Sequence, residues 1–336
     1  MTEIKNNTRI LAIWLFFCAF MVMAMTGIGA VTRLTESGLS ITEWNIISGT
    51  IPPLTEDSWA LEFEKYQATP EYLHKNQSMT LTEFKKIFFW EWFHRLWGRL
   101  IGIAFSCPLI FFLIKGYIAK EDRSRYMILF LLGGSQGALG WFMVQSGLVD
   151  RPSVSHFRLA AHLSLALTIY AGLLLMAFRN LALATYALPS SIRIHGVISL
   201  MALAITIIWG AFVAGLDAGM IYNSFPFMGK GIMPPELGKT PFLYDPASIQ
   251  FTHRVLGVLT GVLIFLYGLR WMRFNKKIGW ILSTCVCIQI MLGVMTLLSM
   301  VYIPIAVTHQ MNAVILLSCV IYTLYIGRPS RPRISS

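Results

Sequence analysis

The sequence predicts an all-α integral membrane protein in which eight transmembrane helices form two pseudo-symmetric four-helix bundles. Three observations lead to this prediction: an apolar composition, eight long apolar stretches and an internal repeat. Hydrophobic residues make up 56% of the 336 residues and charged residues only 13%, whereas soluble domains carry about 25% charged residues. So few charges could not cover a water-soluble surface, which excludes a cytosolic enzyme, a disordered chain and a nucleic-acid-binding protein.

Eight apolar stretches are long enough to cross about 30 Å of hydrocarbon as helices. They are residues 10–31, 88–114, 126–147, 157–178, 194–216, 249–269, 278–300 and 304–327. The last two are separated by little more than Tyr302 to Pro304. We do not expect the first stretch to be a cleaved signal peptide, because its apolar run is too long and no A-x-A site follows it.

Lys and Arg residues are distributed unevenly between the two sides of the predicted membrane region. One side holds 15 basic and three acidic residues, and the other holds 12 basic and 13 acidic residues. The 15 basic residues are Lys5, Arg9, Lys115, Lys120, Arg123, Arg125, Arg179, Arg193, Arg270, Arg273, Lys276, Lys277, Arg328, Arg331 and Arg333. Because Lys and Arg are retained on the cytoplasmic side, both termini are expected to be cytoplasmic. The net charge of +11 then reflects membrane topology, and no nucleic acid is expected as a partner.

The spans and loops suggest a division of the chain into two bundles joined by a linker. The expected parts are the N-terminal tail and first span (1–31), an outer loop (32–87), the rest of the N-terminal bundle (88–178), a cytoplasmic linker (179–193), the C-terminal bundle (194–327) with an outer loop (217–248), and a cytoplasmic tail (328–336). All five cysteines lie in spans rather than loops, which argues against a disulfide framework.

The first four spans resemble the last four in the same order. Matching residues are Gly29 and Gly210, Gly38 and Gly219, the run His94–Gly102 and the run His253–Gly261, Gln136 and Gln289, Gly140 and Gly293, and His162 and His309. Each half has an even number of spans, so both halves insert in the same orientation. This pattern is a parallel repeat, related by an axis along the membrane normal.

Four of the seven histidines fall at repeat-related positions near the outer ends of the even-numbered spans: His94, His162, His253 and His309. Polar side chains inside spans are costly and tend to mark sites, and two histidines on facing helices form a bis-imidazole clamp. Zinc would require further ligands at each site, and copper would favour closer spacing or Met and Cys ligands. Haem needs only axial ligands and an apolar slot, so two haem sites are predicted, with these four residues as ligands of the iron.

Other residues near these histidines have two interpretations each. Gly98, Gly102, Gly257 and Gly261 follow a histidine by four or eight residues on its helix face. They would either leave room for a macrocycle or allow close helix packing. Arg95 and Arg254 would either pair with haem propionates or reach the interface as anchors. In the outer loop, Arg33, Glu36 and Trp44 would either line a haem edge or cap the loop.

The two sites differ three residues before the first histidine, where Glu91 precedes His94 and Gln250 precedes His253. A residue at this spacing lies on the same helix face as the histidine. A carboxylate can accept a proton from a reacting group, whereas the amide keeps the shape without that chemistry. The difference indicates one reactive site and one site that only carries electrons. The other interpretation is that Glu91 simply lies near water at the interface.

These residues together resemble the haem A synthase family over about residues 10–327. The resemblance rests on the segment Glu91–Arg95, the matching Thr252–Arg254, the pair His162 and His309, and the segment Gly29–Trp44. The long outer loop is similar to that of the proteobacterial and mitochondrial subgroup. It has no Cys pair between residues 32 and 87, unlike some bacterial members.

The resemblance implies an oxidoreductase that converts the C8 methyl group of haem O, through an alcohol, to the formyl group of haem A. It implies that His94 and His162 hold the substrate, that Glu91 is catalytic, and that His253 and His309 ligate a haem b cofactor. From their positions beside the histidines, Arg95, Gly98 and Gly102 are expected at the substrate site, and Arg254, Gly257 and Gly261 at the haem b site. Such a protein lies in a bacterial inner membrane and supplies haem A for cytochrome oxidase. A haem O synthase, an electron-transfer protein and a second copy of the chain remain open as partners.

Two other functions account for part of this pattern. A di-haem b-type cytochrome explains the four histidines but leaves the difference between Glu91 and Gln250 without a reason. A haem transporter fits a parallel repeat. However, transporters often have broken helices and charge pairs at the midplane, whereas these spans are nearly free of charge there.

Overall fold

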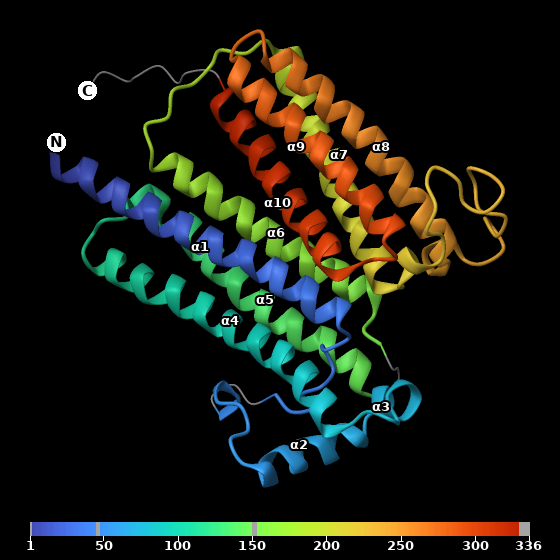
Figure 1. Ribbon diagram of the computed structural model, residues 1–336. Coiled ribbons are helices and arrows are strands. Elements are labelled where there is room, and N and C mark those ends of the chain that lie inside the picture. The colour runs from blue at the N-terminus through green and yellow to red at the C-terminus, as the bar shows by residue number, and fades with distance from the viewer. Residues whose placement is uncertain (1, 45–47, 150–152, 329–336) are drawn as a thin grey trace. The chain divides into compact units, whose positions relative to one another are not determined.

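The computed structural model describes residues 2–44, 48–149 and 153–328, which are largely helical and include no strand (Figure 1). Eight helices are long and apolar enough to cross a membrane. They are α1 (Thr2–Leu34), α4 (Leu81–Ile114), α5 (Arg123–Val149), α6 (His156–Arg179), α7 (Ser190–Gly215), α8 (Pro246–Trp271), α9 (Lys276–Leu298) and α10 (Ile303–Ile326). The prediction of an all-α protein with eight spans is confirmed. Arg331 and Arg333, in the predicted C-terminal tail, lie outside the described residues.

Several helices extend beyond the apolar stretches because polar residues cap them. Helix α4 begins at Leu81 rather than at residue 88, since the Thr80 side chain accepts the Glu83 N–H and the Glu83 carboxylate accepts the Thr80 N–H. Such a capping box satisfies backbone N–H groups that a helix start leaves unpaired. Asp245 caps α8 in a similar way, accepting hydrogen bonds from the backbone of Ala247 and Ser248.

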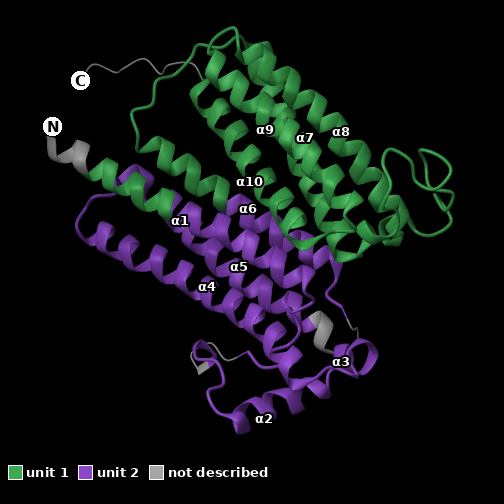
Figure 2. Cartoon of the chain, in the orientation of Figure 1, with its two compact units in different colours: residues 1–17, 170–336 green, residues 18–169 purple. Residues whose placement is uncertain are grey.

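The chain divides into two compact units (Figure 2). Unit 1 comprises residues 1–17 and 170–336, and unit 2 comprises residues 18–169. The division passes within α1 and α6, whereas the sequence predicts a boundary in the linker 179–193. The arrangement as two equal bundles stays a prediction.

Within unit 1, helices α7 to α10 pack as a ring in which each helix contacts the next and α10 returns to α7. Its core contains fully buried Trp271, Tyr267, Ile264 and Leu282. Helices α8 and α9 approach closely at Gly268, where an added Cβ would lie 3.1 Å from the Gly279 carbonyl oxygen. Small residues of this kind permit close helix packing in membranes.

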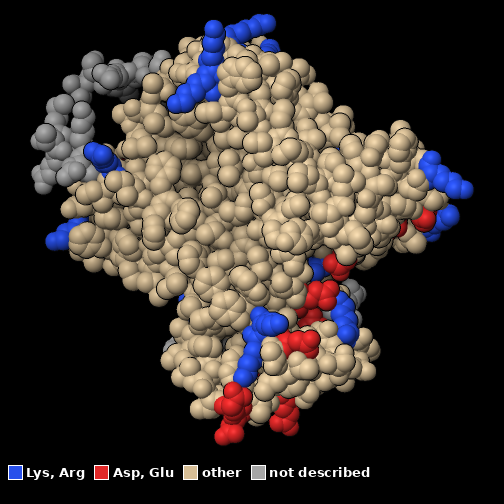
Figure 3. Space-filling view, viewed as in Figure 1, with Lys and Arg blue, Asp and Glu red and all other residues tan. Residues whose placement is uncertain are grey.

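Within unit 2, the predicted outer loop contains two short helices, α2 (Glu56–Gln67) and α3 (Pro70–Lys75). Tyr66 of α2 packs its ring against Phe84 at the start of α4, with ring centroids 5.2 Å apart. Phe88, Trp59 and Phe63 complete this aromatic cluster. Acidic side chains gather over α2 and α3 in the view of Figure 3. The segment is therefore a packed structure that covers the start of α4. All five cysteines lie elsewhere in the chain and are free.

Candidate functional site

The predicted histidine pairs lie together, each pair inside one unit. His94 on α4 and His162 on α6 are within electrostatic range of each other in unit 2. His253 on α8 and His309 on α10 have the same relationship in unit 1. Each pair therefore offers two imidazoles from two helices.

A glycine on a neighbouring helix faces each of the four histidines. A Cβ added to Gly29 would lie 3.2 Å from Cε1 of His94, and one added to Gly140 would lie 3.1 Å from Cε1 of His162. In the second half, a Cβ on Gly210 would lie 3.2 Å from Cε1 of His253. Gly293 is tighter still, at 2.9 Å from Cε1 of His309. These glycines are required by close approach, since a methyl group would press on the imidazole.

The repeat pairs these four glycines in the sequence, but the sequence alone does not show what they contact. The glycines that the sequence singles out behave differently. An added Cβ would meet nothing within 4 Å at Gly102 and Gly257, and only Met25 Cε at 3.4 Å at Gly98. At Gly261 a Cβ would lie 2.6 Å from Ile290 Cδ1. Gly102 and Gly257 therefore leave open space beside their helices, an added Cβ at Gly98 would make ordinary contact with Met25, and Gly261 serves helix packing.

A glutamine from the adjacent helix contacts the second histidine of each pair. Gln136 Nε2 lies 3.2 Å from both ring nitrogens of His162, and Gln289 Nε2 lies 3.2 Å from Nδ1 of His309. Only the second glutamine is fixed from behind, because Asn312 Nδ2 donates to Gln289 Oε1 at 2.8 Å. Gln136 Oε1 is buried with no hydrogen-bond partner among the described residues.

The donor set at these sites fits haem better than a metal ion held by protein ligands alone. The described residues contain no group of three or more His, Cys, Asp or Glu side chains able to hold a metal ion. Nδ1 of His94 and Nδ1 of His253 are buried and have no hydrogen-bond partner in the described part of the chain. Two imidazoles in an apolar setting match a macrocycle that brings its own equatorial ligands and needs only axial ones.

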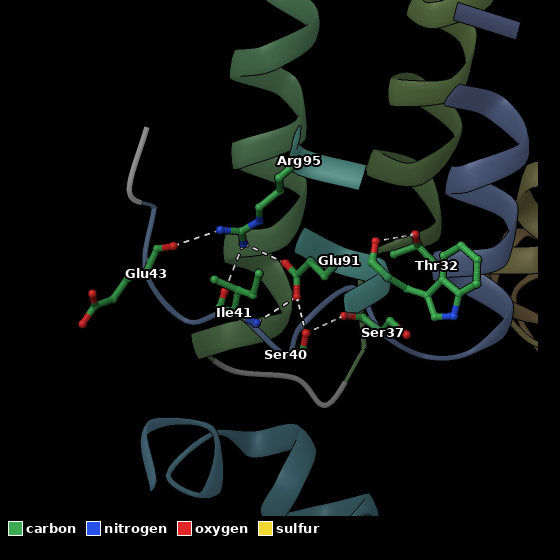
Figure 4. A network of polar contacts seen from close by, with 8 residues as sticks. Thr32, Ser37, Ser40, Ile41, Glu43, Glu91 and Arg95 are labelled. Atoms are coloured by element: carbon green, nitrogen blue, oxygen red, sulfur yellow. Dashed lines mark hydrogen bonds and ion pairs between the residues drawn. The ribbon is translucent and has the colours of Figure 1, made fainter. Parts of the chain in front are cut away.

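Glu91 is buried, with 3% of its surface exposed, and both of its carboxylate oxygens are engaged (Figure 4). Oε2 accepts hydrogen bonds from the Ser40 hydroxyl and the Ile41 backbone N–H, each at 2.8 Å. Oε1 forms an ion pair with Arg95 Nη2 at 2.7 Å. Ser40, Ile41 and Arg95 all donate to this carboxylate, so Glu91 fastens the segment after α1 to the histidine-bearing helix α4.

Arg95 holds the same segment from the other side. Its Nη1 donates to the Glu43 carbonyl at 2.9 Å and its Nη2 donates to the Ile41 carbonyl at 3.0 Å (Figure 4). Trp44 covers the guanidinium, with its ring centre 4.9 Å from Cζ, a distance typical of cation–π contacts. Arg95 and Trp44 therefore fix the loop, a role that the sequence pattern leaves open.

The second half has a matching arrangement in which a neutral amide replaces the carboxylate. Arg254 Nη2 donates to the Tyr222 carbonyl and its Nη1 to the Ser224 carbonyl, each at 2.8 Å. Gln250, which stands where the first half has Glu91, donates to the same Tyr222 carbonyl at 3.1 Å. In both halves the arginine after the histidine thus holds outer-loop carbonyls, and only the first half places a carboxylate there.

A family model for cytochrome oxidase assembly proteins matches residues 12–321 of the chain. Among curated relatives, the heme A synthase of Rhodospirillum centenum is 46% identical over 335 aligned positions, covering 96% of this chain and 89% of the relative. The heme A synthase of Rickettsia bellii is 44% identical, with 95% and 97% covered. That of Nitrosospira multiformis is 41% identical, with 93% and 92% covered. These matches confirm the resemblance that the motifs indicate.

Proposed function

The chain belongs to the family of cytochrome oxidase assembly proteins, and we propose that it is the oxidoreductase that converts haem O to haem A. In this reaction the C8 methyl group and one water molecule give a formyl group, four protons and four electrons. The product supplies haem A to cytochrome oxidase. The chain's eight membrane-spanning helices suit a substrate as apolar as haem O.

The unit 2 histidines hold the substrate in this proposal. His94 and His162 hold the iron of the substrate with Gly98 beside them, and Gly102 leaves open space beside α4. Glu91 lies one turn from His94 on the same face of α4 and takes up a proton released from the methyl carbon or positions the attacking water. Arg95 keeps that carboxylate in place through the ion pair at 2.7 Å.

The unit 1 histidines hold a haem b cofactor. His253 and His309 are the ligands, with Arg254 and Gly257 beside them. When bound, this haem would supply one-electron transfer, and an electron-transfer protein outside the chain would accept the four electrons released by the oxidation. The neutral Gln250 keeps the loop attached through the Tyr222 carbonyl but offers no carboxylate, so this site carries electrons without reacting.

The single observation that supports two unlike sites is the exchange of Glu91 for Gln250 at matching places in the repeat. Both side chains attach an outer loop to a histidine-bearing helix. Glu91 accepts hydrogen bonds and pairs with Arg95, whereas Gln250 donates to a carbonyl, so only the first half places a proton acceptor beside its histidine pair. With basic residues at one end of the spans, we further propose a bacterial inner membrane location with cytoplasmic termini.

The test is haem extraction and chromatography of the detergent-purified protein, expressed with a haem O synthase. The wild-type protein should contain haem B together with haem O, its alcohol or haem A. Glu91→Gln should retain haem B and haem O but form haem A about 10²–10⁴-fold more slowly. Glu64→Gln, which removes an exposed carboxylate in α2, is the matched control.

Two results would contradict the proposal. Haem A formation by Glu91→Gln at the rate of the Glu64→Gln control would remove the catalytic role of Glu91. Haem B alone in the wild-type protein, with haem O available, would identify a b-type electron-transfer cytochrome instead.

A further inference from the structure

The end of unit 1 where α8 finishes and α9 begins carries basic residues and no acidic ones. Arg270, Arg273, Lys276 and Lys277 lie there, together with Arg193 near the start of α7. The sequence contains no Asp or Glu in residues 151–216 or after Asp245. Figure 3 shows basic side chains without acidic ones over this end. Anions that neutralise these charges must therefore come from outside this part of the chain.

A pocket of about 330 Å³ lies among these charges, lined by His195, Leu266, Leu269, Arg270 and Arg273. It opens between α7 and α8, both of which belong to unit 1. His195 belongs to neither of the two histidine pairs. Its lining combines two guanidinium groups with two apolar side chains.

Hydrogen bonds hold Arg270 in a fixed position at this pocket. His195 Nε2 lies 3.0 Å from the Leu263 carbonyl oxygen, so this nitrogen carries the proton and donates. His195 Nδ1 then accepts from Arg270 Nη1 at 3.2 Å. Arg270 Nη2 also donates to the Ser191 hydroxyl at 3.3 Å. These contacts orient the guanidinium and leave it with donors to spare.

Arg273 lies one turn further along and is exposed. No carboxylate of the described residues pairs with either arginine. Two guanidinium groups one turn apart can bind one phosphate group through several charge-assisted hydrogen bonds.

The apolar part of the pocket distinguishes a lipid from a dissolved anion. Leu266 and Leu269 are 47% and 41% exposed, and each stands four residues before one of the two arginines, Arg270 in α8 and Arg273 just after its end. On a membrane-spanning helix, such leucines face acyl chains. An anion with an attached acyl chain would contact both parts of the pocket, whereas free phosphate would contact only one.

We propose that the pocket formed by His195, Leu266, Leu269, Arg270 and Arg273 binds the headgroup of an anionic phospholipid. The phosphate lies between the two arginines and an acyl chain runs along the two leucines. Basic pockets between transmembrane helices are suited to such headgroups.

The test measures how lipids shift the thermal unfolding midpoint of the purified full-length protein in neutral detergent. Phosphatidylglycerol, phosphatidylcholine and inorganic phosphate are titrated separately. Phosphatidylglycerol should raise the midpoint saturably, and the other two should not. Arg273→Gln should raise the half-saturating concentration by about tenfold, because it removes the charge-assisted hydrogen bonds of one guanidinium group.

Lys276→Gln is the matched control, because it removes one exposed positive charge at the same end but outside the pocket lining. It should bind phosphatidylglycerol as the wild-type protein does. If both variants weakened phosphatidylglycerol binding equally, diffuse attraction between charges would explain the binding and the pocket would not. If inorganic phosphate raised the unfolding midpoint as much as phosphatidylglycerol does, the ligand would be an anion and not a lipid. If phosphatidylglycerol had no effect, the proposed binding site would be wrong.

Discussion

A Cβ added to Gly140 of α5 would lie 3.1 Å from Cε1 of His162 on α6. This separation is tighter than ordinary van der Waals contact, so the imidazole would have to move by a few tenths of an ångström. The same relationship holds at all four histidines, on four different neighbouring helices. Each of the four imidazole rings is therefore positioned by a backbone surface that has no side chain.

We predict that Gly140→Ala lowers haem retention at the unit 2 site by about 10-fold or more, the usual cost of disturbing the groups that orient a metal ligand. The measurement is haem content and the low-spin absorption spectrum of the purified variant. Gly137→Ala is the control on the same helix, because its added Cβ would meet nothing within 4 Å. Since alanine favours a helix over glycine by roughly 0.5–1 kcal/mol, the control should bind haem normally. Equal haem content in the two variants would contradict the proposed contact.

A second prediction concerns the hydrogen bonds by which Arg95 and Arg254 hold loop carbonyls. Arg95→Lys loses hydrogen bonds from a charged donor, each worth about 1.5–3 kcal/mol. Backbone amides of residues 38–44 should then exchange with deuterium about 10- to 100-fold faster, since 1.4 kcal/mol corresponds to tenfold. Arg254→Lys should instead accelerate exchange at residues 222–227, whose carbonyls it holds. If each variant accelerated amide exchange in both loops, the cause would be general destabilisation, because each arginine is expected to hold only its own loop.

A third prediction concerns pH and the buried Glu71 of α3, which is 3% exposed. Burial raises the pKa of this carboxyl from 4.5 to about 7, although a hydrogen bond from the Tyr66 hydroxyl at 3.2 Å opposes the shift. Between these two values the folded loop binds more protons than the unfolded loop. Its stability is therefore greatest below pH 4.5 and falls as pH rises to about 7. The loss is at most about 3 kcal/mol, at 1.36 kcal/mol per unit.

Hydrogen-exchange protection factors of α2 and α3 between pH 5 and 8 would measure this effect. Glu71→Gln should remove the decrease in protection across this range, since the amide does not titrate. Glu64→Gln, at an exposed position in the same loop, should leave it unchanged. A decrease that persists in Glu71→Gln would show that another group is responsible.

Much of the fold could be predicted from the sequence because membrane spans depend on length and apolar composition. The ends of the helices are harder to predict from apolar composition, because they depend on capping residues. Helix α4 begins before its apolar stretch because Thr80 and Glu83 cap it, and α8 begins at Asp245 for the same reason. The helices α2 and α3 were not predicted, because they are stabilised by an aromatic cluster that includes Phe84 of a different helix.

At the candidate site, the repeat identified the histidines but not the residues that position them. Gly29 and Gly140 appear in the repeat, yet their contacts with the imidazoles depend on how neighbouring helices pack. The sequence suggests that Arg95 is a propionate ligand or an interface anchor, whereas its hydrogen bonds go to loop carbonyls, backbone atoms that no sequence motif specifies. Ser40 was missed for a related reason, since it reaches Glu91 from a loop distant in sequence.

The last prediction concerns why two similar histidine pairs would hold haem differently. Asn312 fixes Gln289 behind His309, through hydrogen bonds to Gln289 Oε1 at 2.8 Å and to the Cys285 carbonyl at 3.1 Å. In the first half, the residue three positions after His162 is Leu165, which offers no hydrogen bond to Gln136. A permanent cofactor benefits from a fixed ligand environment, whereas a substrate that must leave as product does not.

Asn312→Leu should therefore release haem B about 10-fold more readily, while haem O binding in unit 2 stays unchanged. Leu165→Asn is the reciprocal variant, and it should slow the release of product haem from unit 2. Both effects can be followed by dialysing the purified protein against apomyoglobin, which captures released haem, and identifying the remaining haems by chromatography. Loss of haem O and haem B to the same extent from Asn312→Leu would show that the amide supports the whole helix bundle rather than one ligand, because a local effect must distinguish the two sites.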